Sequence, residues 1–487
     1  MQRVLFAFCN LSVAKGVAMV MEKLNKLYSG RITAPPNQIM DEMLLKPQFE
    51  FEVNNLLCFY KNIELAILKE QKRLGLLDNH EYNIIKDAIE SLKKEDFTAD
   101  SKGNFSDISF AFEENIKKKL ENNLPPNWHL DKSRNDFQAT AMRMYGAQHL
   151  KNSIHKTKSL VMSLHTLAKE YVEIPMPGFT HHQPAQIISP AFYLISISRV
   201  MLDAIKRLHF VLEDINLCPL GAGAMAGLEL EWDRHILAKD LGFKNPLNTA
   251  LVAISERDWM QKIAFEYSLI GNKISRFCTD FVYWSSYENK FIDLPDSMVG
   301  ISSAMPQKKN FVILERIRGG CVHLNSFLND FINTSQNSAY TNLVQITKEG
   351  SRYLEELFNC YDRVMTLFDL FISNLKFNED QLLDYCNSDF FGAFSLANYL
   401  TKEEKIPYRA SQKIVGEFVC KEKSKVEDLI RTIEKYDYQV TDDIPLEKFF
   451  DAKWLLNSKN TLGSTAPDFV KKELLNQEDE LRRCFNE

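Results

Sequence analysis

The chain is 487 residues long, with 45% apolar and 25% charged residues and a formal net charge of -6 at pH 7. This length is sufficient for two or three domains with a large core, and the composition is that of an ordinary soluble protein. The mild acidity, without a basic arm or an arginine stripe, argues against nucleic-acid binding. Nine cysteines without a CxxC pair favour reduced thiols in the cytoplasm over a disulfide framework or a zinc site.

The first residues, about 1–20, are apolar apart from Arg3 and Lys15, as in a short targeting segment. Lys15 interrupts the apolar run, which is too short to span a bilayer. We therefore favour an N-terminal extension, with Met19 or Met21 beginning the functional chain. No other stretch approaches about 18 uninterrupted apolar residues, so no membrane span is predicted.

The N-terminal part, residues 1–130, is predicted to be a helical domain. It ends near Pro125 and Pro126, because two adjacent prolines cannot lie inside a helix. A separate small helical domain is predicted at 385–487, where the apolar pattern becomes shorter.

Between these domains, three apolar stripes with alternating steps of three and four residues predict long helices. The stripes run from Leu194 to Val211, from Ile263 to Trp284 and from Leu354 to Phe371. Each covers about 20 residues, or about 30 Å of helix, and no strand-type alternation lies between them. We therefore predict an all-α fold whose central domain, residues 131–384, is a bundle of long helices. We expect the bundle to form an oligomer, because its helices are apolar on more than one face.

Two short segments of the central domain carry residues suited to ligand binding. Residues 129–138 read HLDKSRNDFQ, in which Ser133 or Asn135 could cap a helix and Asp136 would favour its positive end. Residues 177–186 read PGFTHHQPAQ and place a histidine beside a threonine at a predicted helix start. Only one of His181 and His182 is expected to point into a site, and a structural role is the plainer interpretation of a lone histidine.

Residues 300–310 read GISSAMPQKKN and are the most informative segment of the chain. A serine hydroxyl acts as a base only when cations and backbone amides stabilise its alkoxide, and Lys308 and Lys309 supply such charge. Asn310 and local N–H groups could hold a carboxylate as it gains electron density. A polar surface loop with two solvated lysines is the alternative interpretation of the same residues.

GISSAMPQKKN resembles the signature loop of the fumarase/aspartase superfamily, G-S-S-x-M-P-x-K-x-N, and its MPQKKN form is similar to the argininosuccinate lyase branch. SRND, the T-H-x-Q of residues 180–183, PLGAGAMAG (219–227), SERD (255–258) and LGSTA (462–466) also resemble that branch, as does SGR at 29–31. The resemblance therefore covers nearly the whole chain. It implies an all-α homotetramer with active sites shared between three subunits, a cytoplasmic location and no metal or organic cofactor. It also implies a small-molecule substrate, a role in arginine biosynthesis and release of fumarate by anti β-elimination.

The resemblance assigns roles residue by residue. Ser302 aligns with the catalytic base, Lys308 with the lysine that stabilises the carbanion, and His181 with the residue that assists protonation of the leaving nitrogen. Ser303 is an alternative base if Ile301, which replaces a glycine, shifts the loop. The expected substrate-binding residues are Asp107, Ser133, Arg134, Asn135, Thr180, Gln183, Arg257, Ser303, Asn310, Tyr340 and Gln345.

Several residues depart from the branch pattern. Ser109 replaces a histidine, Asn342 a lysine and Val252 an aspartate, while Asp131 and Lys132 replace a glycine and an arginine. Loss of a cation beside a substrate carboxylate would cost about 1.5–3 kcal/mol. Three hypotheses therefore stay open: a C–N lyase acting on another N-substituted aspartate, argininosuccinate lyase activity itself, and a non-catalytic structural or binding homologue. SRND and MPQKKN make an adenylosuccinate lyase the weaker interpretation.

Overall fold

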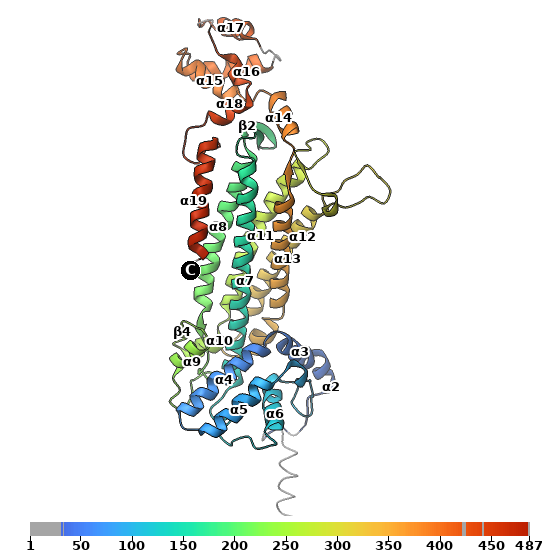
Figure 1. The fold of residues 1–487 in the computed structure, drawn as a ribbon, viewed down its shortest axis with the longest axis vertical. Helices are drawn as coiled ribbons and strands as arrows, with labels where there is room; N and C mark the ends of the chain where they lie inside the picture. Colours follow the sequence, from blue (N-terminus) through green and yellow to red (C-terminus); the bar gives the residue numbers. More distant parts are fainter. Residues whose placement is uncertain (1–30, 33, 421–424, 441–442, 486–487) are drawn as a thin grey trace, which may run out of the picture. The chain divides into compact units, whose positions relative to one another are not determined.

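The computed structural model describes residues 31–32, 34–420, 425–440 and 443–485 (Figure 1). The predicted N-terminal extension lies outside the described residues. The chain divides into two compact units, and each is considered by itself. The first unit holds the described residues up to Gln148, together with Ile215–Arg257 and Asn337–Glu349. The second holds His149–Asp214, Asp258–Gln336 and the described residues from Gly350 onward. The division into domains at residues 130 and 384 stays a prediction.

Short and medium helices build the first unit, as the sequence predicts for its N-terminal part. They are α2 (Gln38–Met40), a π-helical turn η1 (Asp41–Leu45), α3 (Lys46–Asn55), α4 (Leu57–Arg73), α5 (Asn79–Ser91), η2 (Lys94–Asp96), α6 (Ile108–Lys119), the start of α7 (Arg134–Glu170), β3 (Leu217–Cys218), α9 (Arg234–Asp240), β4 (Asn245–Pro246), α10 (Ala250–Ser255) and a π-helical turn η4 (Gln345–Glu349). Strands β3 and β4 pair in parallel.

Helix α5 shows how the local sequence starts these elements. Asp78 accepts a hydrogen bond from the backbone N–H of Glu81, whose carboxylate accepts one from Asp78 N–H, which together form a capping box. Helices α4 and α5 each bury isoleucines spaced four residues apart, which keeps them on one helix face. These are Ile63 and Ile67 on α4, with Ile85 and Ile89 on α5.

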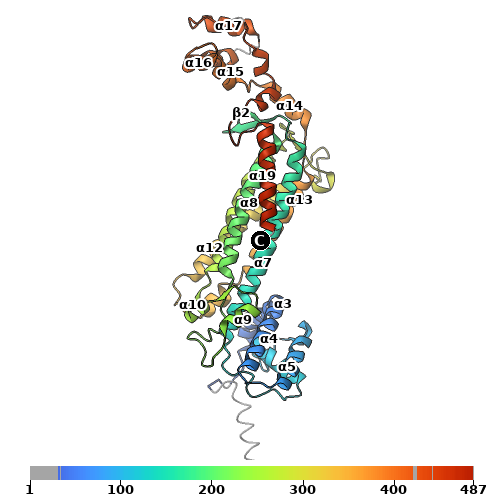
Figure 2. The same cartoon turned by 60° about the vertical axis from the view of Figure 1, so that its left-hand side comes forward.

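Long helices form the second unit, and the three predicted stripes are confirmed. The rest of α7 is joined by α8 (Pro190–Ile215), α11 (Asp258–Trp284), α12 (Val312–Ser335) and α13 (Leu354–Asn374), whose bodies run side by side in Figures 1 and 2. Every stripe residue on α8 and α13 is buried, and on α11 only Phe277 is half-buried. The large aromatics are packed as core residues: Tyr267 stacks on Tyr361 with ring centroids 3.8 Å apart. The predicted all-α architecture is therefore confirmed.

Paired strands appear at two places in the second unit. Strands β1 (Met176–Thr180) and β2 (Gln183–Ile188) form an antiparallel hairpin, and β5 (Ile292–Asp293) pairs with β6 (Lys376–Phe377). The hairpin corrects the sequence prediction of a helix start at His181. Helix α8 begins only at Pro190, and His181 and His182 form a two-residue turn with φ of 55° and 60°. Such a turn needs positive φ at both positions to match the twist of the strands.

The C-terminal region of the second unit has a cluster of short helices with its own core. It comprises α14 (Glu379–Ser388), α15 (Ala393–Lys402), α16 (Tyr408–Cys420), α17 (Val426–Glu434), η5 (Leu446–Phe449) and α18 (Ala452–Asn457). Leu396, Phe418, Leu429 and Phe449 are fully or almost fully buried in this core. The last helix, α19 (Pro467–Phe485), leaves the cluster and runs along α8 (Figure 2).

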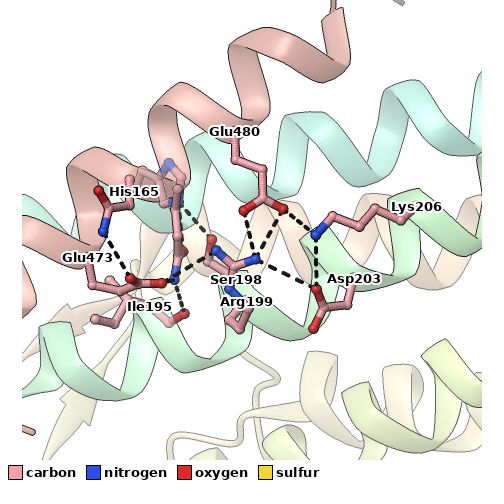
Figure 3. A network of polar contacts seen from close by, with 10 residues as sticks. His165, Ile195, Ser198, Arg199, Asp203, Lys206, Glu473 and Glu480 are labelled. Carbon is pink, nitrogen blue, oxygen red and sulfur yellow. Dashed lines mark hydrogen bonds and ion pairs between the residues drawn. The ribbon is translucent and has the colours of Figure 1, made fainter. Parts of the chain in front are cut away.

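Polar contacts fasten α19 to α7 and α8 (Figure 3). Glu480 accepts hydrogen bonds from Arg199 at 2.8 and 3.1 Å and forms an ion pair with Lys206 at 2.8 Å. Deeper in the contact, the buried His165 ring lies 2.7 Å from the Ser198 hydroxyl and 3.2 Å from the Gln477 side-chain oxygen. The sequence gives no sign of this packing, because the partners lie about 280 to 310 residues apart.

Candidate active site

Helix α7 begins at the SRND motif. Ser133 is the capping residue, because its hydroxyl accepts a hydrogen bond from the backbone N–H of Asn135 at 3.2 Å. Of the two capping residues that the sequence allows, the structure therefore selects Ser133. Asn135 donates its side-chain amide to the carbonyl of Ala224 at 3.1 Å.

Asp136 does more than favour the helix end. It is buried, and its carboxylate accepts hydrogen bonds from the N–H groups of Gly221 and Gly223, each at 3.0 Å. Burial raises the pKa of Asp136 to about 7, although these backbone donors act to lower it. SRND and the glycine-rich segment after β3 are thus one local structure.

Asp107 and Arg134 are the predicted site residues that form a direct ion pair. Asp107 caps α6 by accepting from the backbone N–H groups of Ser109 and Phe110, and its second oxygen lies 2.8 Å from the Arg134 guanidinium. Both side chains line a pocket of about 370 Å³, together with Glu52 and Lys348. Lys348 lies on η4 and pairs with the buried carboxylate of Glu52.

Lys348 is a candidate that the sequence reasoning missed. Spacing in the sequence gave no signal for it, because η4 is a π-helical turn in which residues three apart do not share a face. The pocket therefore holds two cations, Arg134 and Lys348, each oriented by a carboxylate. The two cations of this pocket are therefore balanced by two carboxylates.

The other predicted residues of the first unit lie around α10 and η4. Arg257 is buried and donates to the carbonyl of Glu256 at 2.8 Å, while the Tyr340 hydroxyl donates to the Glu256 carboxylate at 3.2 Å. Burial and the neighbouring Arg143 lower the pKa of Arg257 to about 10. Gln345 is exposed at the start of η4.

Two residues that depart from the branch pattern, Lys132 and Ser109, have well-defined neighbours in the structure. The Lys132 side chain is only 4% exposed; its amine lies 2.9 Å from Glu64 and 3.5 Å from the centre of the Trp128 ring. Burial lowers its pKa, and Glu64 acts in the opposite direction. Ser109, in place of a histidine, lines a small pocket with Lys132 and Glu64. The change to lysine at 132 is therefore accommodated by a local ion pair.

In the second unit, the loop of residues 300–310 is closed at its base. The backbone groups of Gly300 and Asn310 form a reciprocal pair, with the Gly300 N–H 2.7 Å from the Asn310 carbonyl. The Asn310 side chain donates to the Gly300 carbonyl at 3.1 Å. Inside the loop, the Ser302 hydroxyl accepts from the backbone N–H of Met305 at 3.0 Å. This arrangement holds Ser302 in a defined turn.

The two lysines of the loop differ in their surroundings. The Lys309 amine forms ion pairs with Asp293 at 2.8 Å and Asp296 at 3.2 Å, which raise its pKa, and it donates to the carbonyl of Leu294. Lys308 is exposed and pairs with no carboxylate among the described residues. Ser303 is also exposed. Lys309 therefore anchors the loop, and Lys308 is available for a ligand.

The turn of the hairpin presents three predicted residues: Thr180, His181 and Gln183 are all exposed, and Thr180 pairs with Gln183 across the turn. The His182 ring packs edge-on against Tyr283, with ring centroids 6.1 Å apart, and lines a pocket with Thr180. Non-glycine residues at positive φ cost about 1–3 kcal/mol each and persist where surrounding structure imposes them.

The predicted site residues thus fall into two groups. Seven lie in the first unit, and seven lie on the hairpin turn and the 300–310 loop of the second. Within the second unit, no hydrogen bond or ion pair of the described residues joins the hairpin turn to the loop. No group of three or more metal-ligating side chains occurs in the described part of the chain, and no helix there is long and apolar enough to cross a membrane.

Comparisons with known proteins give one consistent result. A family model described as "Lyase" matches residues 61–325. Argininosuccinate lyase from Streptococcus agalactiae serotype Ia is 30% identical over 478 residues, which cover 95% of this chain and 100% of the relative. Argininosuccinate lyase from Campylobacter jejuni is 30% identical over 460 residues, covering 92% of this chain and 97% of the relative.

Solved structures share the fold. EDDS lyase in complex with formate superposes with a TM-score of 0.79 at 20% identity, over 94% of this chain and 93% of that structure. Class II fumarase from Schistosoma mansoni superposes with a TM-score of 0.69 at 17% identity, over 85% of this chain and 95% of that structure. At these identities the likeness concerns the fold alone.

Proposed function

Because the chain belongs to the lyase family, in its argininosuccinate lyase branch, we propose that it cleaves a C–N bond of an N-substituted aspartate and releases fumarate by anti β-elimination. Argininosuccinate is the first substrate to test, and a related adduct is the alternative. The resemblance found in the sequence motifs is confirmed by relatives that match over 92–95% of the chain. No observation favours the non-catalytic alternative.

The contrast between Lys308 and Lys309 is the observation that carries the mechanism. The Lys309 amine is fixed by two aspartates, whereas Lys308 is exposed on the same closed loop as Ser302. We assign Ser302, as its alkoxide, to remove the proton next to one substrate carboxylate. Lys308 and the loop amides then stabilise the resulting carbanion, in which charge moves onto that carboxylate. The C–N bond breaks as the double bond of fumarate forms, and His181 assists protonation of the departing nitrogen.

We assign the remaining contacts with the substrate to the predicted binding residues and to Lys348. Arg134 and Lys348 lie in one pocket, where Asp107 and Glu52 hold them, and we assign them to substrate carboxylates that would replace these partners. Thr180, Gln183, Ser133, Asn135, Arg257, Ser303, Asn310, Tyr340 and Gln345 complete the proposed set. Asn310 also closes the loop base, so its amide serves both purposes.

We further propose a homotetramer in which three subunits share each active site. The bundle helices of the second unit expose large apolar side chains, as helices that pack against partner subunits do. These are Met162, Phe210, Phe265, Val322 and Leu370, between 46% and 75% exposed. The absence of bonds between the hairpin turn and the loop within the described unit also favours assembly from several chains. We place the protein in the cytoplasm, because the seven described cysteines are free thiols.

The direct test is fumarate release from argininosuccinate, followed by ultraviolet absorbance, with Ser302→Ala as the variant. Removing a general base is expected to lower kcat by about 10²- to 10⁴-fold while the tetramer still forms. Undiminished turnover in Ser302→Ala would overturn the assignment of the base. No turnover by folded wild-type protein would exclude argininosuccinate and direct the search to other N-substituted aspartates.

A further inference from the structure

The segment of residues 129–136, which carries SRND, holds a second segment at residues 221–232. Asp131 makes the contacts at one end. Its carboxylate accepts hydrogen bonds from the backbone N–H groups of Glu229 and Leu230 and from the indole N–H of Trp232, each at 2.9 Å. Three donors therefore converge on one charged side chain, an arrangement of charge-assisted hydrogen bonds.

Asn135 and Asp136 make the contacts at the other end. Asp136 accepts the N–H groups of Gly221 and Gly223, and Asn135 donates to the carbonyl of Ala224. Between these two anchors, residues 224–227 are exposed. They form a bridge between the two anchors, and the Ala224 carbonyl of this bridge holds Asn135, which is expected to contact substrate.

Asp131 adopts a backbone conformation that residues other than glycine disfavour. Its φ is 59°, in the left-handed region that favours glycine, the residue that Asp131 replaces in the branch pattern. The aspartate is therefore not a neutral replacement: it occupies a strained conformation while its carboxylate binds residues about 100 positions later in the chain.

We propose that Asp131 is a positioning residue for substrate binding in this chain. It acts through the bridge: its carboxylate fixes residues 229–232, and the bridge in turn places the Ala224 carbonyl that orients the Asn135 amide. This proposal rests on the proposed function because it requires that Asn135 contacts the substrate. Without Asp131, the 229–232 end of the bridge keeps the Asp233 N–H bond to Glu70 and the Arg73 bond to the Glu231 carbonyl, while the Gly227 N–H still bonds to the Ala222 carbonyl. A bridge held by fewer contacts would populate its binding-competent position in a smaller fraction of molecules, and the apparent affinity would fall by that fraction.

The test compares D131G and D131N with wild type and with a matched control, D437G. Asp437 also has a left-handed backbone, with φ of 62°, but it is exposed and lies in the C-terminal helical cluster. The full-length tetramer is assayed for kcat and KM, for the Kd of fumarate by calorimetry, for hydrogen exchange in 224–230 and for its thermal midpoint.

In D131G we expect KM and the fumarate Kd to rise about tenfold, with kcat changed less than about twofold, because the competent bridge is then about one tenth populated. Exchange in 224–230 should accelerate, and the thermal midpoint should fall, because the loss of three charge-assisted hydrogen bonds outweighs the strain that glycine relieves. D131N, which keeps one acceptor oxygen, should lie between D131G and wild type. D437G should leave KM, the fumarate Kd and exchange in 224–230 unchanged.

Two results would overturn the proposal: unchanged affinity and exchange in D131G, or the same changes in D437G. A fall in thermal midpoint without a change in KM or fumarate Kd would show a merely structural role and would also overturn it. If wild-type protein releases no fumarate from any aspartate adduct, the proposed function fails. The exchange measurement still decides whether Asp131 anchors the bridge.

Discussion

Glu480 is the residue through which the ion pairs between α19 and α8 can be tested. It meets two cations, Arg199 at 2.8 and 3.1 Å and Lys206 at 2.8 Å, and its side chain is 24% exposed (Figure 3). Glu480→Gln keeps the size of the side chain and removes its charge. Each solvent-accessible ion pair contributes about 0.2–1 kcal/mol; Glu480 forms two, and one Arg199 nitrogen contacts both of its oxygens, so we expect a loss of about 1–2 kcal/mol.

The assay is hydrogen exchange of the α19 amides at low ionic strength. A local loss of about 1–2 kcal/mol corresponds to exchange about 5- to 30-fold faster in this helix, with little change in α11. Glu478→Gln is the matched control, because Glu478 lies on the same helix but pairs with one cation, Lys169 at 2.6 Å. Its effect should be less than about 1 kcal/mol.

The contribution of Glu480 to stability depends on pH in a defined direction. Burial acts to raise the pKa of Glu480, but hydrogen bonds from Lys206 and Arg199 outweigh it, so the folded pKa lies below the ordinary value of 4.5. The stabilisation is therefore present above the unfolded pKa and is lost as pH falls through the folded pKa. The reasoning fails if Glu480→Gln exchanges no faster than Glu478→Gln, or if high salt does not reduce the difference.

Two further predictions follow from buried groups. Burial lowers the pKa of His165 below its ordinary 6.5, so the unfolded chain takes up a proton more readily. Stability should therefore fall as pH drops from about 7 to about 5, and His165→Gln should flatten that slope in thermal-unfolding midpoints. Gly223 has φ of 64°, and an added Cβ would lie 2.5 Å from the Gly227 carbonyl oxygen. Gly223→Ala should destabilise the protein by about 2–4 kcal/mol in thermal unfolding, because strain and a clash add. Gly75→Ala, with φ of 71° and open space, should show the smaller strain cost alone, and equal losses in the two variants would contradict this.

Periodicity in the sequence was sufficient to predict the helix bodies. Residues such as Ile263, Tyr267 and Ile270 recur at helical spacing because one helix face is buried along its whole length, and the structure buries them. The hairpin at residues 176–188 was not predictable in the same way. Its turn is His181–His182 rather than an Asn-Gly pair, and Pro184 interrupts the second strand, so neither usual hairpin signal is present.

The candidate site shows the same difference between features that local sequence patterns indicate and features that they do not. Short motifs pointed to Ser302, Lys308, His181 and SRND as candidate site residues, and their roles in the reaction stay a proposal. The local motif also predicted a helix cap, which Ser133 provides. The sequence did not indicate the ion pair between Lys348 and Glu52, because these residues lie almost 300 positions apart in the chain.

Local sequence patterns were thus enough to predict the helical class, the long core helices and the branch of the lyase family, and they supplied the candidate site residues. The tertiary structure alone decided which of two adjacent lysines is anchored, where α19 packs and what Asp131 holds. The physical reason is the distance along the chain over which each interaction acts. Helical periodicity and motif spacing are set by neighbours within a few residues, whereas an ion pair or a carboxylate that gathers distant N–H groups exists only after the chain has folded.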